Sequence, residues 1–161
     1  NKNKKEKGKT APAIPKAVKS FLSDMSSFSP EWSGSILRML PESVRGAYPL
    51  LREHLRILSA GICIGEAKGK DFIPAEELAL STALRPDAFP VADLDWDDAI
   101  RYLKKEALLL PAGTEKGYVL VRHKKFPLGF AKHLGNRANN LYPQEWRIRT
   151  GYIPEQVKTF E

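Results

Sequence analysis

The chain has 161 residues, of which 42% are hydrophobic and 28% charged, a composition that fits a globular domain and excludes a wholly disordered chain. No apolar run approaches the ~20 residues that a membrane-spanning helix needs, so we expect a soluble, cytoplasmic protein with no membrane partner. The single cysteine, Cys63, excludes an internal disulfide and a cysteine-rich zinc site.

The net charge of +7 is unevenly distributed along the chain. Residues 21–115 carry ten basic and fifteen acidic residues, whereas residues 116–150 carry eight basic residues and one acidic residue. Aromatic residues are interleaved with the charged residues of this later segment, which indicates that the charges lie on a folded surface. The natural partner of such a positively charged surface is a polyanion. The lysine-rich residues 1–15 are instead expected to form a flexible basic linker.

The first part of the folded region is predicted to be helical. After Pro15, apolar residues spaced at i, i+3, i+4 and i+7 predict one helix. The Ser-Pro-Glu run at residues 29–31 is typical of a helix N-terminus and predicts a second helix, which Pro41 ends. With a further helical turn over residues 50–54, these elements predict a small helical subdomain over residues 16–52.

From about Leu55 onward, alternating apolar residues and glycine-rich turns are typical of short strands. Two helices are predicted among them, one from Pro74 to Leu84 and one that Asp95 or Asp97 caps. Residues 55–57 and 62–66 are predicted to form two strands or one bent strand. The other predicted strands are residues 72–73, 108–110, 118–123, 126–130 and 146–148, with a polar loop at residues 135–141. This pattern predicts an α+β fold, with a mixed β-barrel and two helices over residues 53–150 and a tail over residues 151–161.

Residues with catalytic or ligand-binding chemistry are scarce in the first two thirds of the chain. Cys63 lies between two isoleucines in a predicted strand, which favours a buried core residue over a nucleophile. Gly61 and Gly65 lack the spacing of a phosphate-binding loop and indicate a strand bend. The three histidines, His54, His123 and His133, have no metal-ligand spacing. No metal site is therefore predicted.

Four aspartates, at positions 93, 95, 97 and 98, precede a predicted amphipathic helix. They have the oxygen ligands of a hard-metal site, but capping of the helix explains them more simply. An independent small enzyme stays open as an alternative, and it would require a deep pocket with strongly perturbed titratable groups.

The strongest candidate site is the basic, amide-rich stretch between residues 124 and 149. Arginine and lysine neutralise phosphates, asparagine offers a donor and an acceptor to a base edge, and tyrosine stacks on unpaired bases. Phe130 and Trp146 are predicted to be core residues instead. A solvated basic loop would have the same composition, so both interpretations stay open at this level. The candidate RNA-binding residues are Lys124, Lys125, Lys132, His133, Asn136, Arg137, Asn139, Asn140, Tyr142, Arg147 and Arg149.

The same stretch resembles a known family. The run Phe126-Pro127-Leu128-Gly129-Phe130-Ala131-Lys132, followed by Gly135-Asn136-Arg137, Asn139-Asn140 and Tyr142-Pro143, is similar to the PUA-like domain that ends RsmF-type ribosomal RNA cytosine-5 methyltransferases. The resemblance extends over about residues 53–149, and more loosely over residues 16–52. Pro127 and Gly129 match the bend that places the basic loop, whereas Ala138 stands where relatives often carry a bulky or basic residue.

The resemblance implies that this chain is the RNA-binding C-terminal part of such an enzyme. The family's catalytic domain binds S-adenosylmethionine and uses two cysteines, whereas this chain has one cysteine and no Rossmann-type glycine motif. We therefore expect no cofactor in this chain and no methylation by it alone. The expected partners are small-subunit ribosomal RNA and the chain's own methyltransferase domain, with the protein a monomer. The alternative is a module that packs on the methyltransferase domain and has little RNA affinity of its own.

Overall fold

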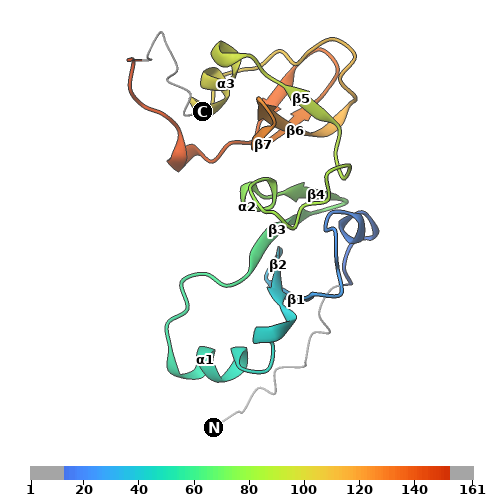
Figure 1. Ribbon diagram of the computed structural model, residues 1–161, viewed down its shortest axis with the longest axis vertical. Coiled ribbons are helices and arrows are strands. Elements are labelled where there is room, and N and C mark those ends of the chain that lie inside the picture. The colour runs from blue at the N-terminus through green and yellow to red at the C-terminus, as the bar shows by residue number, and fades with distance from the viewer. Residues whose placement is uncertain (1–12, 153–161) are drawn as a thin grey trace. The chain divides into compact units, whose positions relative to one another are not determined.

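The computed structural model describes residues 13–152, which fall into two compact units that divide between Phe89 and Pro90 (Figure 1). Each unit contains one four-stranded sheet, with the strand orders β1-β2-β3-β4 and β5-β6-β7-β8. The predicted α+β class is confirmed, and within the described residues both sheets are open rather than closed into one barrel. Residues 53–89 lie in the first compact unit, although the resemblance groups them with the later domain.

The first unit contains a β-hairpin where the second helix was predicted. Strands β1 (Phe28–Ser33) and β2 (Ile36–Pro41) pair antiparallel, and Gly34 turns the chain between them with a φ of 60°. The predicted helix after residues 29–31 is therefore wrong. The reason is tertiary, because strand pairing buries Leu37 and Met39 completely and lets β2 pair with β3 on its other edge.

Strands β3 (Ile62–Lys68) and β4 (Asp71–Pro74) complete this sheet, as the alternation of residues 62–66 predicted. The strand predicted at residues 55–57 is wrong, since these residues are outside any strand. Two glycines explain how closely the backbones approach. A Cβ on Gly61 would lie 2.2 Å from the carbonyl oxygen of Met39, and one on Gly65 would lie 2.2 Å from that of Ile73. The pairing of β2 with β3 shifts in register between Leu37 and Arg38, opposite Gly65 and Cys63, and Gly61 and Gly65 allow the close backbone packing.

The helices of the first unit are short. They are η1 (Lys16–Ser20), η2 (Glu42–Val44), α1 (Tyr48–His54) and α2 (Glu76–Ala79). The helix predicted to end at Leu84 stops after one turn, because Leu84 pairs with Leu22 in a β-bridge instead. The first predicted helix is likewise reduced to a 3₁₀ turn, although Val18, Phe21 and Leu22 are buried as its spacing predicted.

The second unit is a mixed sheet with one helix. Strand β5 (Val91–Asp93) runs parallel to β6 (Gly117–His123), which pairs antiparallel with β7 (Phe126–His133). Strand β8 (Ala138–Asn140) pairs with β7. Helix α3 (Trp96–Leu103) joins β5 to β6, and its residues Ala99 and Tyr102 pack in one buried cluster with Val121 and Ala131. As predicted, Asp95 caps the helix by accepting a hydrogen bond of 2.8 Å from the Asp98 amide.

Three predictions for this unit are wrong. Within residues 108–110 only Leu108 makes a bridge, to Ala138, and Leu109 is 77% exposed. The predicted strand at residues 146–148 is replaced by a 3₁₀ turn, η3 (Gln144–Trp146), and the extended segment after it. The predicted loop at residues 135–141 contains β8.

Two predicted segments lie largely outside the described residues. The basic linker of residues 1–15 is described only from residue 13, and the tail of residues 151–161 only to residue 152. Within residues 13–152 no helix is both long and apolar enough to cross a membrane.

Candidate nucleic-acid interface

A tight turn between β7 and β8 presents polar and basic side chains to solvent. The Leu134 amide donates a hydrogen bond of 2.9 Å to the Arg137 carbonyl, which closes the turn. Gly135 occupies its first central position with a φ of 106°, a conformation that glycine adopts without strain. Asn136 and Arg137 are therefore exposed at the tip of the hairpin.

Two further basic groups flank this tip. The side chain of Lys116 lies over Gly135, because a Cβ at that position would come within 2.8 Å of the Lys116 Cε. His133 Nδ1 donates a hydrogen bond of 3.1 Å to the Glu115 carbonyl, which orients the ring. We call Lys116, His133, Asn136 and Arg137 the hairpin-tip cluster.

A second polar row crosses the sheet beside the tip. Tyr118 lies opposite Lys132, and Lys132 lies opposite Asn139, so the three side chains share one face. Lys132 Nζ lies 4.9 Å from the centroid of the Tyr118 ring and 3.4 Å from its hydroxyl, so Lys132 is engaged with this tyrosine. Asn139 is exposed.

A basic cleft lies at the C-terminal end of α3. The Ile148 amide donates a hydrogen bond of 2.9 Å to the Leu103 carbonyl, which fixes the segment after η3 beside the helix. Between them is a cleft of about 370 Å³, which we call the α3 cleft. Lys104, Arg147 and Arg149 line it together with Glu106, and within residues 13–152 none of these three cations is in an ion pair.

Asn140 and Tyr142 have structural contacts in this region. The Asn140 amide nitrogen donates to the carbonyls of Tyr102 and Glu106, at 2.8 and 3.1 Å, and its oxygen accepts from the Tyr142 amide at 2.9 Å. The Tyr142 ring packs edge-on against Tyr102 with centroids 5.4 Å apart. Lys105 Nζ donates to the carbonyls of Tyr142 and Asn140. Both donor hydrogens of Asn140 are thus used inside the protein.

The other predicted basic turn lies at the opposite end of the sheet. Lys124 and Lys125 form the β6–β7 turn, with φ values of 46° and 72°. The eight residues of β7 separate this turn from the hairpin-tip cluster, a distance of about 23 Å at ~3.3 Å per residue. The candidate residues of the two basic turns therefore lie at opposite ends of the β6–β7 hairpin.

Comparison with known proteins identifies this unit. Residues 89–148 match the family described as the methyltransferase RsmF PUA domain, and this stretch begins where the second compact unit begins. Residues 89–148 are thus similar to the PUA domain of RsmF, and we call them the PUA domain. The resemblance noted in the sequence is therefore confirmed.

The curated relatives are much longer than this chain. The ribosomal RNA small subunit methyltransferase F of Shewanella baltica (strain OS195) is 32% identical over 110 residues, which cover 65% of this chain and 22% of that protein. The protein of the same name from Shewanella pealeana is 32% identical over 92 residues, which cover 56% of this chain and 18% of that protein. The chain thus spans about a fifth of the length of these relatives.

The family's proline-leucine-glycine motif forms a β-bulge in this PUA domain. Val121 pairs with Gly129 and Arg122 pairs with Pro127, so Leu128 is the extra residue on β7. The bulge bends the strand that leads to the hairpin tip, as the resemblance implied. On its β6 side, Arg122 makes a two-point ion pair with Asp93, with distances of 2.6 and 2.7 Å. Arg122 keeps the pKa of the Asp93 carboxyl below its usual value.

Three residues of this interface were missed or misjudged from the sequence. Lys104 belongs to a helix end. Lys116 is the first basic residue of the segment 116–150, but it lies in a turn before β6 and outside residues 124–149, from which the candidate residues were chosen. Trp146 was predicted to be buried but is 50% exposed, whereas Phe130 is 1% exposed as predicted. An exposed tryptophan next to Arg147 is a common stacking surface for unpaired bases. The only sequence signal for it was its position beside two arginines.

The catalytic and metal alternatives gain no support from the described residues. Cys63 is half-buried in β3, and burial together with the nearby Glu77 raises the pKa of its thiol. His123 Nδ1 donates to the Leu94 carbonyl at 2.8 Å, and its ring packs edge-on against Trp96. No group of three potential metal ligands comes together within residues 13–152.

Proposed function

We propose that this chain is the RNA-binding C-terminal portion of a ribosomal RNA cytosine-5 methyltransferase. The PUA domain would bind structured small-subunit ribosomal RNA and place the target cytosine of that RNA near a catalytic domain outside this chain. The benefit of such positioning is entropic, since a held substrate reacts as if it were highly concentrated.

The distribution of charge supports this proposal. Residues 13–89 contain nine basic and nine acidic residues, whereas residues 90–152 contain eleven basic and seven acidic residues. Four of the five arginines in the first unit are in ion pairs. In the PUA domain Arg137, Arg147 and Arg149 make no ion pair within residues 13–152, and all three are exposed. Exposed cations without carboxylate partners attract phosphates most strongly.

The hairpin-tip cluster and the α3 cleft offer complementary contacts to RNA. Arg137, Arg147 and Arg149 would bind phosphates, and Asn136 and Asn139 would bind a base edge or a ribose hydroxyl. The two sites are linked, because Asn140 joins β8 to the carbonyls of Tyr102 and Glu106, and Glu106 lines the α3 cleft. Lys124 and Lys125 would contact a more distant part of the same RNA.

The residues nearest to a nucleotide-binding loop do not fit S-adenosylmethionine. The glycines closest in sequence to a nucleotide-binding loop, Gly61 and Gly65, are packed against the carbonyls of Met39 and Ile73 and leave no room for a ligand. Cys63 has a raised pKa, whereas a nucleophilic cysteine needs a lowered one. The cofactor and the methyl transfer would therefore belong to the part of the enzyme outside this chain.

The proposal is tested by competition binding. Fluorescence anisotropy would follow a labelled small-subunit ribosomal RNA fragment, with transfer RNA and duplex DNA as competitors, over a range of salt concentrations. We expect preferential binding of the ribosomal RNA that persists near physiological salt. Equal binding of all three nucleic acids that disappears as salt rises would contradict the proposal, because it would leave only general charge attraction.

A further inference from the structure

Helix α1 exposes its apolar side chains to solvent. The helix has seven residues and none of them is buried, and Leu50 and Leu51 are 59% and 40% exposed. A helix of this length is marginal in water unless its apolar face packs against something. Arg52 lies over the Tyr48 ring at 5.8 Å from its centroid, which is a contact within the helix itself.

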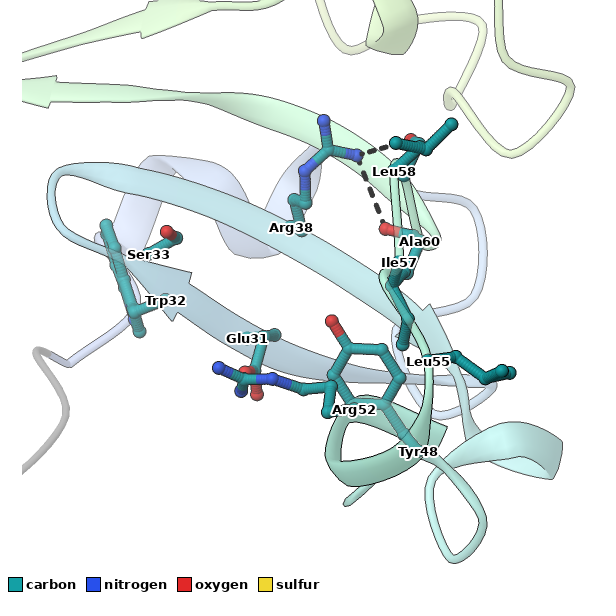
Figure 2. Close-up of a pocket in the computed structure, with 11 residues that line it drawn as sticks. Glu31, Trp32, Ser33, Arg38, Tyr48, Arg52, Leu55, Ile57, Leu58 and Ala60 are labelled. Atoms are coloured by element: carbon teal, nitrogen blue, oxygen red, sulfur yellow. Dashed lines mark hydrogen bonds and ion pairs between the residues drawn. The ribbon is translucent and has the colours of Figure 1, made fainter. Parts of the chain in front are cut away.

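Two hollows adjoin this helix, and Tyr48 lines both. One, of about 310 Å³, is lined by Trp32, Leu55 and Leu58 as well (Figure 2). The other, of about 460 Å³, is lined by Phe28 and Leu40 among others. Figure 2 shows the side chains of Tyr48 and Leu55 along one side of the first hollow.

Two leucines on the rim of the first hollow are strongly exposed. Leu55 is 60% exposed and Leu58 is 85% exposed, and both lie in the segment that follows α1. We define the α1 surface as Trp32, Tyr48, Leu50, Leu51, Leu55 and Leu58. Several large apolar side chains that gather at one exposed place usually mark a binding surface for another protein.

The charges of this hollow are already neutralised. Arg52 makes an ion pair with Glu31 at 2.9 Å, and Arg38 makes one with Glu77 at 3.2 Å. These arginines therefore offer little attraction to a phosphate backbone, unlike the arginines of the PUA domain. The observations favour a protein surface as the occupant over RNA.

We propose that the α1 surface is the docking site for the catalytic part of the same polypeptide. This inference rests on the proposed function, in which this chain belongs to a longer methyltransferase. About four fifths of the length of the curated relatives lies outside the matched region, which is ample for a folded domain. The protein thus has two separate surfaces, with RNA on the PUA domain and the catalytic part on α1.

Hydrogen–deuterium exchange of the full-length protein and of the 161-residue chain tests this inference. We expect the amides of residues 48–60 to exchange at least about tenfold more slowly in the full-length protein than in the isolated chain. Equal exchange in both proteins would overturn the inference. Protection of these residues in the isolated chain after a ribosomal RNA fragment is added would also overturn the inference, since RNA would then be the occupant. The same holds if they are protected under conditions where sedimentation shows that the isolated chain dimerises, since a second copy would then be the occupant.

A paired substitution with a matched control sharpens the comparison. Leu55→Asp with Leu58→Asp should return residues 48–60 of the full-length protein to the exchange rate of the isolated chain. Leu80→Asp changes a leucine that is 52% exposed and lines neither hollow, so it should leave the protection intact. If residues 48–60 of the full-length paired variant still exchange slowly, the α1 surface is not the docking site.

The same paired variant distinguishes failure of this inference from failure of the proposed function. Its substitutions are in the first unit, so RNA binding by the 161-residue chain should be unchanged. Failure of the unmodified 161-residue chain to bind ribosomal RNA would contradict the proposed function alone. The exchange comparison would still decide whether α1 is covered.

Discussion

The side-chain amide of Asn140 donates a hydrogen bond of 2.8 Å to the backbone carbonyl of Tyr102, and so ties strand β8 to the last turn of α3. Because its neighbour Asn139 points to the opposite face and is exposed, two adjacent asparagines have different roles. Asn140 holds the fold, and under the proposed function the exposed Asn139 would contact RNA.

Asn140→Ala should therefore destabilise the PUA domain. The substitution removes the bonds to Tyr102 and Glu106 and the acceptor for the Tyr142 amide, and we expect a loss of about 1–3 kcal/mol in the free energy of unfolding. Urea denaturation would measure it. Asn139→Ala is the matched control and should change stability by less than about 0.5 kcal/mol. Equal stability of both variants would contradict the assigned roles.

Two glycines with nearly the same φ provide a test of close backbone approach. Gly34 and Gly61 have φ values of 60° and 64°, but only at Gly61 would a Cβ meet another atom, the Met39 carbonyl oxygen at 2.2 Å. Gly34→Ala should cost about 1–2 kcal/mol from backbone strain alone. Gly61→Ala should cost about 1–3 kcal/mol more, because the strands must separate. Thermal unfolding of both variants measures the difference, and similar losses would argue against the close approach.

The thiol of Cys63 should react slowly with iodoacetamide. Burial is the main cause of its raised pKa, and the Glu77 carboxylate adds to it, so the reactive thiolate forms only at higher pH than in a free cysteine. The rate of alkylation, measured as a function of pH, gives the midpoint of thiol ionisation. Glu77→Gln should lower that midpoint because it removes a negative charge. A midpoint at or below that of free cysteine would be incompatible with this environment.

Asp24 should remain ionised to unusually low pH. The hydroxyls of Ser26 and Ser27 lower its pKa from 3.8 to about 2 by donating hydrogen bonds to the carboxylate. Its contribution to stability is therefore complete above pH ~4 and is lost as pH falls through about 2. An NMR titration of the Asp24 carboxyl carbon measures this directly. Ser26→Ala should raise the pKa, whereas Ser20→Ala, whose hydroxyl bonds to Ala17, should not change it.

Local sequence patterns predicted the PUA domain better than the first unit. The β6–β7 hairpin and the Asp95 cap depend on residues close in sequence, so alternation and capping rules were sufficient. The run at residues 29–31 also has a good local capping pattern, but pairing of β2 with β3, more than 20 residues later, overrides it.

Long-range contacts also explain what was missed in the candidate site. The roles of Asn140 and Lys105 depend on carbonyls that lie more than 30 residues away in the sequence. The position of Lys116 over Gly135 is likewise set by tertiary structure. Composition identified the basic stretch, but it could not divide its residues between the hairpin tip, the far turn and the interior.

The central claim is that exposed arginines of the PUA domain bind RNA phosphates, and the salt dependence of binding tests it most directly. Arg137→Ala and the control Arg45→Ala, which changes an exposed arginine paired with Glu42 in the first unit, would be compared with the unmodified chain on a small-subunit ribosomal RNA fragment. We predict that Arg137→Ala weakens binding and lowers the slope of log K against log salt by about one unit, while Arg45→Ala leaves the slope unchanged. An unchanged slope for Arg137→Ala would contradict the claim.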